Sequence, residues 1–248
     1  MRSMVREYDN DSNCDIETNG EARFASAIAL ASNSHDLVID IGCNVGQYTL
    51  VLANNNMKGR CLLIDANPAC LDQASINLSK YSLRCDYISS AVGSKDGEAN
   101  FVCSDSDPIS PINSLYEMRT IGNRYSHSFK TVVVYMRTLQ SILDLLNLSG
   151  SDILLLKADI EGSEFSMMQG AEELFKKNNI KYFQFEFGHA SRASKTYLHD
   201  IVSFLTYYNY SLYVVKPAKL EPVIFDAFIE NRYSMINFVA IAAGYQPV

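Results

Sequence analysis

Two short stretches that share one pattern constrain the fold of this chain more than any other feature. Residues 38–46 (VIDIGCNVG) and 156–164 (LKADIEGSE) each carry an apolar run that leads into carboxylates and then glycine. A continuous apolar run is typical of a strand buried on both faces of a parallel sheet. Ligands of open parallel sheets bind beyond the carboxyl ends of the strands. We therefore expect both stretches to form one site, with a ligand held by the first and chemistry done at the second.

The composition favours one soluble α/β domain. The chain has 248 residues, of which 48% are hydrophobic, enough for a sizeable buried core. Its net charge of −7 argues against a nucleic-acid partner or an anionic membrane. The start lacks the apolar segment of a signal peptide, and no run approaches the ~18 apolar residues of a membrane span. The six cysteines form no C-x-x-C pair and are expected to be reduced, so we predict a cytoplasmic location.

Strand-like and helix-like segments alternate along the chain. This alternation predicts parallel β-α-β winding, hence an α/β fold with helices on both faces of a mostly parallel sheet. We expect a flexible N-terminal segment over residues 1–20 and a single domain over 21–248. The polar loop 104–129 is expected to contribute to specificity. Strands are predicted at 37–41, 60–65, 84–89, 99–103, 130–136, 152–158, 181–187, 211–216 and 236–242, and helices at 21–32, 47–54, 67–80, 138–146, 164–177 and 194–208.

The first glycine stretch has the features of a nucleoside site. Gly42 and Gly46 permit a tight turn and close approach of a ligand, and they flank Asn44 in a G-x-N-x-G spacing. This spacing lacks the G-x-G-x-x-G fingerprint of dinucleotide-binding proteins. Asp65 ends the second predicted strand, where a carboxylate can accept hydrogen bonds from both ribose hydroxyls. Asp40 can face a ligand's ammonium group. A cationic, ribose-bearing ligand without phosphates fits all of these features, and S-adenosylmethionine is the common one.

Each of these residues also has a purely structural interpretation. The glycines can serve turn geometry alone, and Asp40 can bond backbone N–H groups of the turn. Glu161 and Glu164 can place negative charge at the N-terminus of the next helix, the expected role of Glu164. His189 can be an exposed loop residue.

The second stretch resembles one family of methyltransferases. Residues 155–164 (LLKADIEGSE), followed by 170–174 (GAEEL), are similar to a K-x-D-x-E-G-x-E block and the G-A helix of the FkbM-type family. Residues 40–46 and 91–93 also match, and the resemblance covers roughly 36–242. It implies a Rossmann-like, three-layer fold with a seven-stranded sheet whose last strand is antiparallel. It also implies that Ala91 lines the cofactor site and that the cofactor is S-adenosylmethionine. An acidic residue that many relatives carry at the end of the third strand is absent here.

The resemblance implies methyl transfer to oxygen, often on a hydroxyl of a small molecule, sugar or lipid. Such a displacement needs an aligned acceptor and a base that removes the hydroxyl proton. The candidate bases are Asp159, Glu161, Glu186 and His189, and Lys157 is expected to neutralise part of this cluster. Asp159 is also expected to contact the cofactor. Mg²⁺ bound by the carboxylates is an alternative, although no separate ligand pattern predicts a metal.

Two other functions are compatible with the sequence. A non-catalytic nucleoside-binding or scaffold protein of the same fold would keep the cofactor site without turnover. An oxidoreductase that uses a nicotinamide cofactor is disfavoured by the missing third glycine of the fingerprint. The oligomeric state and the identity of the acceptor are not encoded in any recognisable motif.

Overall fold

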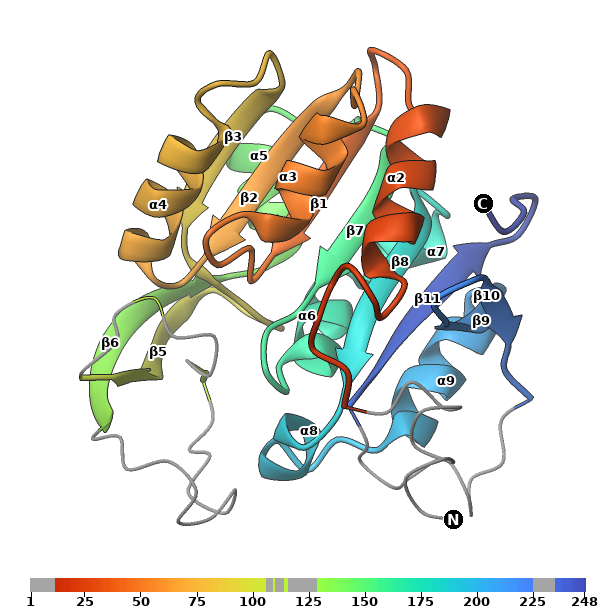
Figure 1. The fold of residues 1–248 in the computed structure, drawn as a ribbon. Helices are drawn as coiled ribbons and strands as arrows, with labels where there is room; N and C mark the ends of the chain where they lie inside the picture. The colour runs from red at the N-terminus through yellow and green to blue at the C-terminus, as the bar shows by residue number, and fades with distance from the viewer. Residues whose placement is uncertain (1–11, 106–108, 110–113, 116–128, 225–234) are drawn as a thin grey trace.

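A computed structural model describes residues 12–105, 109, 114–115, 129–224 and 235–248 of the chain. Figure 1 shows how strands and helices alternate through most of its length. The strands are β1 (Leu37–Ile41), β2 (Arg60–Asp65), β3 (Arg84–Ser89), β4 (Ala91–Val92), β5 (Gly97–Ser104), β6 (Phe129–Arg137), β7 (Ile153–Ala158), β8 (Ile180–Phe187), β9 (Tyr210–Val215), β10 (Leu220–Pro222) and β11 (Ile236–Ala242). The helices are α2 (Glu21–Ala31), α3 (Gln47–Asn54), α4 (Pro68–Leu78), α5 (Leu139–Leu145), α6 (Glu164–Gly170), α7 (Glu172–Lys176), α8 (Ala190–Ala193) and α9 (Leu198–Tyr207).

The main sheet has eight strands in the order β10-β9-β11-β8-β7-β1-β2-β3. Strands β3, β2, β1, β7 and β8 pair in parallel, as the alternating pattern predicts. The last strand, β11, runs antiparallel to both of its neighbours, β8 and β9, which confirms the expected antiparallel final strand. The predicted count of seven is one too low, because the short β10 adds to the edge of the sheet beside β9.

Helices cover both faces of this sheet and complete three layers. Helices α2, α3 and α4 lie on one face, the near side in Figure 1. Their buried side chains, such as Phe24 and Leu52, form one apolar cluster with inward-facing residues of the strands. Helices α5, α6, α7 and α9 supply a second cluster, which contains Phe175 and Phe183. Burial of apolar surface on both faces explains why the central strands β1 and β7 are apolar except for Asp40 and Lys157.

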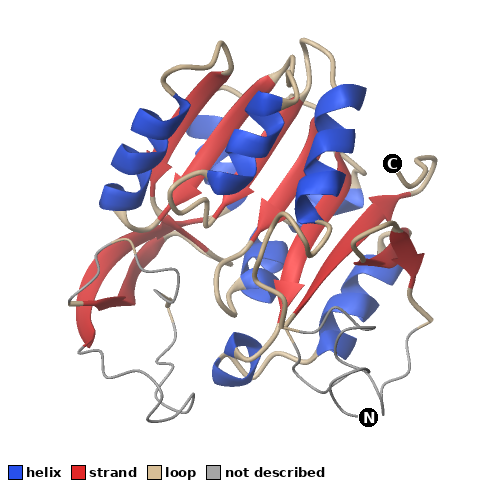
Figure 2. Cartoon of the chain, in the orientation of Figure 1, coloured by secondary structure: helices blue, strands red, loops and turns tan. Residues whose placement is uncertain are grey.

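A second, three-stranded sheet lies beside the carboxyl ends of the main strands (Figures 1 and 2). Its order is β4-β6-β5, with β5 and β6 antiparallel and β4 and β6 parallel. The sequence predicts the β5–β6 pair, whereas β4 is too short to show a periodic pattern. This small sheet brings β4 and β5 next to the end of β2, which matters for the site described below.

Of the predicted helices, one is divided in the structure and another begins later than expected. The helix expected at 164–177 is interrupted at Ala171, where the chain passes close to the second sheet: a Cβ on Gly170 would lie 2.1 Å from the Gly93 carbonyl oxygen. The helix expected at 194–208 begins as α9 only at Leu198, after Lys195 adopts a left-handed φ of 59°. In both cases a local backbone feature stops a pattern that is periodic in the sequence.

The chain before α2 is hydrogen-bonded where it is described. The amide N–H of Ser12 donates to the Met235 carbonyl oxygen at 2.9 Å, and the Asn19 side chain is buried. Residues 1–11 of the segment expected to be flexible lie outside the described residues, as does most of the polar loop 104–129. Among the helices that are described, none is long and apolar enough to cross a membrane.

Candidate functional site

The loop between β1 and α3 is built from alternating left-handed residues. Gly42, Asn44 and Gly46 have φ values of 73°, 47° and 79°. Glycine adopts such angles without a steric penalty, and asparagine tolerates them better than most residues. The predicted tight turn is therefore confirmed. The predicted close approach of a ligand to the backbone of Gly42 is not confirmed. A Cβ at this position would lie 1.9 Å from the Asp159 carbonyl oxygen, so the space beside Gly42 is filled by the protein itself. Gly42 is needed where the loop contacts the end of β7.

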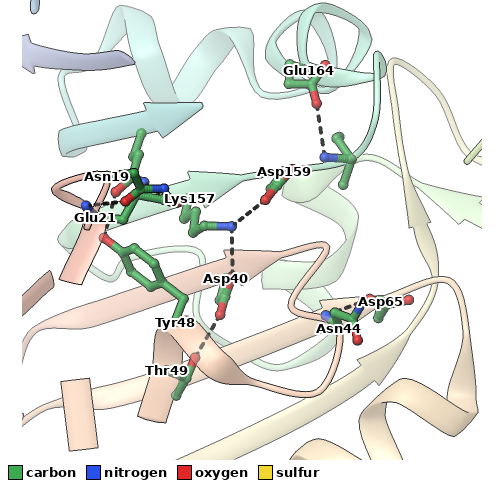
Figure 3. A network of polar contacts seen from close by, with 12 residues as sticks. Asn19, Glu21, Asp40, Asn44, Tyr48, Thr49, Asp65, Lys157, Asp159 and Glu164 are labelled. Atoms are coloured by element: carbon green, nitrogen blue, oxygen red, sulfur yellow. Dashed lines mark hydrogen bonds and ion pairs between the residues drawn. The ribbon is translucent and has the colours of Figure 1, made fainter. Parts of the chain in front are cut away.

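Asp65 braces this loop from the end of β2. Its Oδ2 accepts a hydrogen bond from the Asn44 amide N–H at 2.9 Å, and its Oδ1 accepts one from the Asn67 amide N–H at 2.8 Å. Burial raises the pKa of Asp65, while these two hydrogen bonds oppose that rise. The carboxylate is thus fixed in place, yet it still lines an open pocket. Figure 3 shows Asp65 beside Asn44.

A pocket lies at the carboxyl edge of β1, β2 and β7, roofed by the second sheet. Gly42, Asn44 and Asp65 contribute polar groups on the β1–β2 side, and Asp159 and Glu161 contribute carboxylates on the β7 side. The remaining lining is mostly apolar and small: Ile41, Ile64, Ala66, Cys70, Ser90, Ala91, Val92, Phe101, Ser114, Leu115, Ile160 and Ser163. Apolar walls with a few fixed polar groups suit a flat nucleobase and its ribose. The residues present therefore fit a nucleoside.

Beneath the pocket, a row of buried polar side chains crosses three strands. Asp40 pairs in register with Lys157, which pairs in register with Gln184, so the three side chains lie on one face of the sheet. All three are at most 5% exposed. The Lys157 Nζ lies 4.0 Å from Asp40 Oδ1 and 3.2 Å from Asp159 Oδ2 (Figure 3). Lys157 thus connects the buried row to the carboxylate at the edge of the pocket.

Helices α2 and α3 complete the hydrogen bonds of this row. Thr49 donates its hydroxyl to Asp40 Oδ2 at 2.8 Å, and Tyr48 donates its hydroxyl to Gln184 Oε1 at 2.6 Å. The Gln184 amide in turn donates to Glu21 Oε1 at 2.7 Å. Lys157 Nζ also lies 5.3 Å from the centre of the Tyr48 ring. Buried polar groups are costly unless they are paired, so these bonds fix the row in one arrangement.

Negative charge concentrates around Lys157. Burial alone would lower the pKa of Lys157, but Asp159, Asp40 and Glu21 together raise it, so its ammonium stays charged. Burial and the nearby Asp159 raise the pKa of Glu161 to about 8. Burial, with Asp159 and Glu161, also raises the pKa of Glu186 well above its usual value. Carboxyl groups with raised pKa values can accept or hold a proton near neutral pH.

Glu164 supports the loop that follows β7. Its Oε1 accepts hydrogen bonds from the backbone N–H groups of Ile160 at 3.0 Å and Gly162 at 3.3 Å, and its side chain is buried. Between these two residues, Glu161 has a left-handed φ of 50°. Glu164 stands in the first turn of α6, as expected, and its carboxylate binds the loop before the helix.

The structure gathers only part of the predicted site. Gly42, Asn44, Asp65, Ala91, Asp159 and Glu161 line one pocket. Asp40 and Lys157 lie beneath it, and Gly46 faces helix α4, where a Cβ would lie 3.2 Å from the Ala74 Cβ. Glu186 lies in β8 and His189 follows that strand. Neither residue lines the pocket, and His189 is exposed. Within the described ranges, no group of three His, Cys, Asp or Glu side chains can hold a metal ion.

Gln184, Tyr48 and Glu21 are not among the predicted site residues. Asp40 and Lys157 are each the one polar residue of an apolar strand, whereas Gln184 shares β8 with Lys181 and Glu186. A lone polar residue in a strand buried on both faces must find a partner. The partners themselves come from helices distant in sequence, so no local pattern identifies them.

Several solved structures of methyltransferases are similar in overall shape. They include a TehB-like SAM-dependent methyltransferase from Corynebacterium glutamicum (14% identity, 97% of this chain and 97% of that chain covered, TM-score 0.46). Another is a SAM-dependent methyltransferase from Aquifex aeolicus (13% identity, 97% and 98% covered, TM-score 0.46). A third is a precorrin-6y C5,15-methyltransferase from Geobacter metallireducens (12% identity, 90% and 87% covered, TM-score 0.46). No curated protein sequence matches the chain.

The sequence match to a family model decides the assignment. The model of the methyltransferase FkbM domain matches residues 40–212 of the 248. The matched range begins at Asp40 in β1 and includes Asp65, Lys157, Asp159 and Glu161. It therefore contains the whole β1 loop, the carboxylate of β2 and the acidic segment after β7. This chain belongs to the FkbM family of S-adenosylmethionine-dependent methyltransferases.

Proposed function

We propose that this methyltransferase transfers its methyl group to a hydroxyl oxygen of a small-molecule, sugar or lipid-linked acceptor. One observation carries the proposal: Asp159 lines the nucleoside pocket while Lys157, buried beneath it, lies 3.2 Å from its carboxylate. A carboxylate held at this edge is suited to accept the proton of an attacking hydroxyl. Neutral amines need less help from a base, because their nitrogen is a better nucleophile than a hydroxyl oxygen and can lose its proton after the attack.

The residues divide into two groups in this proposal. Asp65 is placed to accept hydrogen bonds from the ribose hydroxyls, and the loop at Gly42 and Asn44 forms the adjacent wall. Bound S-adenosylmethionine would supply an electrophilic methyl group, and its sulfur would leave as S-adenosylhomocysteine. Asp159 is the proposed base that would take the proton of the acceptor hydroxyl. Alignment and general base catalysis of this kind contribute large factors, the base alone about 10²–10⁴-fold.

Glu161, Glu186 and His189 are proposed to contact the acceptor. The half-buried Glu186 senses the charge of both Asp159 and Glu161, so the three carboxyl groups share one neighbourhood. An acceptor with a negative charge would be repelled by Asp159, whose charge already raises the pKa values of Glu161 and Glu186, whereas a neutral hydroxyl compound would not. This charge favours sugars and uncharged small molecules over phosphorylated ones.

Calorimetric titration and a methyl-transfer assay test the proposal together. We expect micromolar binding of S-adenosylmethionine and S-adenosylhomocysteine and no binding of NADH. With isotope-labelled S-adenosylmethionine and a panel of sugar, lipid and small-molecule alcohols, one acceptor class should become labelled on oxygen. Asp159→Asn should reduce transfer at least ~100-fold, much more than it weakens cofactor binding. Label found only on nitrogen would overturn the oxygen acceptor, and binding without transfer to any acceptor would favour a scaffold role.

The cytoplasm is the proposed compartment. All six cysteines of the chain are free thiols, four of them buried in the core. Proteins of oxidising compartments commonly pair their cysteines. Fractionation of cells that produce the protein would test the location directly.

A further inference from the structure

Ser163 is the unusual polar residue of the nucleoside pocket. In the part of the chain that the structure describes, only Arg23, Asp40 and Ser163 have buried side-chain nitrogen or oxygen atoms without a hydrogen-bond partner. Of these three residues, Ser163 alone lines the pocket. Its side chain is 1% exposed, so bulk water does not satisfy its hydroxyl. An unsatisfied buried hydroxyl costs stability, which makes its presence in a pocket wall informative.

The other serines of the pocket wall have internal partners. The Ser90 hydroxyl donates to the Ala91 carbonyl oxygen at 2.7 Å. The Ser114 hydroxyl donates to the Glu161 carbonyl oxygen at 2.8 Å. Both hydroxyls therefore hold the pocket wall together. Ser163 has no such structural task among the described residues, although it lies in the same wall.

Ser163 also does not act as a helix cap. It occupies the N-cap position of α6, where serine is favoured because its oxygen can accept a hydrogen bond from the first turn, yet its side chain makes no such bond. Glu164 instead accepts the backbone N–H groups of the preceding loop, at Ile160 and Gly162. The Ser163 hydroxyl is thus left for a partner that the folded chain does not contain.

We propose that the Ser163 hydroxyl hydrogen-bonds the amino-bearing edge of the cofactor's adenine and is the residue that selects this base. The inference rests on the proposed nucleoside site. Asp65, on the β2 side, is committed to the ribose, which leaves the base for the part of the pocket walled by Val92, Phe101 and Ile160. These apolar side chains can pack on the faces of a purine, but they offer nothing to its polar edge. A serine hydroxyl can accept from the 6-amino group and donate to a ring nitrogen.

Replacement of Ser163 should affect the stability of the free protein and its affinity for the cofactor differently. Removing a hydroxyl that has no partner leaves the free protein equally stable or slightly more stable. Removing a hydroxyl that contacts the cofactor weakens binding. We expect Ser163→Ala to lower the affinity for S-adenosylhomocysteine about 5- to 10-fold by calorimetry, the effect of losing about one hydrogen bond, with no fall in the melting temperature of the free protein. Ser90→Ala is the matched control, because it loses internal hydrogen bonds and should lower the melting temperature.

A ligand analogue locates the contact on the base. In a homocysteine nucleoside with purine in place of adenine, the 6-amino group is missing. Wild-type protein should bind this analogue about 5- to 10-fold more weakly than S-adenosylhomocysteine, whereas Ser163→Ala should bind the two within a factor of about 2. Unchanged affinity of Ser163→Ala for S-adenosylhomocysteine, or equal losses for the analogue in both proteins, would overturn the assignment. If the wild type binds neither ligand, the proposed function fails before Ser163 is at issue.

Discussion

The ammonium group of Lys157 lies 3.2 Å from the Asp159 carboxylate and joins a fully buried row of polar groups to the edge of the pocket. Asp40, on the other side of Lys157, has one buried oxygen without a hydrogen bond, so Lys157 is the nearby positive charge that compensates it. Because Lys157 contacts both the buried Asp40 and the proposed base Asp159, this one side chain should affect stability as well as methyl transfer.

Replacing Lys157 should therefore damage both properties. Lys157→Met leaves Asp40 as a buried, unpaired carboxylate, and we expect a loss of about 3–5 kcal/mol in the free energy of unfolding, measured with urea. Addition of Asp40→Asn should restore part of this stability, because the fully buried carboxylate is then removed. Methyl transfer should stay at least ~10-fold below wild type in the double variant, since Asp159 still lacks its partner. Full recovery of transfer would show that Lys157 acts only on stability.

Asp65 should determine cofactor affinity. Asp65→Ala removes the proposed partner of the ribose hydroxyls and the acceptor of the Asn44 and Asn67 amides. A hydrogen bond to a charged group contributes about 1.5–3 kcal/mol, so we expect a loss of about 10- to 100-fold in affinity for S-adenosylhomocysteine by calorimetry. Asp86→Ala on the neighbouring β3 is the control: it removes a carboxylate that pairs with Arg60 away from the pocket lining and should leave affinity unchanged.

Glu161 should make stability depend on pH. Its pKa in the folded protein is about 8, raised from an ordinary value of 4.5 by burial and by Asp159 and Glu164. The folded protein then binds this proton more tightly than the unfolded chain does. Stability is therefore fully present below about pH 4.5 and falls as the pH rises through about 8. Thermal unfolding from pH 5 to pH 9 should show wild type losing at least ~1 kcal/mol relative to Glu161→Gln. Parallel curves for the two proteins would contradict the shifted pKa.

Gly42 should tolerate no side chain. Its φ of 73° is strained for any other residue, and a Cβ would lie 1.9 Å from the Asp159 carbonyl oxygen. We expect Gly42→Ala to lower the free energy of unfolding by about 2 kcal/mol or more and to weaken cofactor binding, because the loop must move away from β7. Gly150→Ala, with open space around its Cβ position, should change stability by less than ~0.5 kcal/mol. Differential scanning calorimetry of both variants provides the comparison.

Strands that are buried on both faces are predicted from the sequence almost residue by residue. The bounds of β1 and β2 match the apolar runs at 37–41 and 60–65, because burial and strand length both limit them. The partly exposed β3 also has the predicted bounds, 84–89. The strand β10 is not predicted from the sequence pattern, since its three residues take their conformation from pairing with β9. Local pattern thus predicts the central elements, and tertiary pairing determines the edges.

The candidate site shows the same division. Gly42, Asn44, Asp65, Asp159 and Glu161 follow strands directly, and the carboxyl ends of parallel strands must share one edge. Side chains that reach the site from helices of another layer cannot be predicted in this way, because no local sequence pattern identifies them. The contact of Tyr48 with Gln184 joins residues from α3 and β8, and the free hydroxyl of Ser163 becomes notable only once the bonds around it are known.

The position of β11 has a consequence for how the protein is made. This last strand lies between β8 and β9, so the backbone of β9 pairs with the rest of the main sheet only through a segment synthesised after it. During translation, β9 and β10 lack this backbone pairing until residues 236–242 have left the ribosome. We expect ribosome-bound chains that stop before Ile236 to be cleaved by protease around β9, and released full-length chains to resist. The main sheet is therefore completed only when β11 inserts between two strands that precede it in the chain.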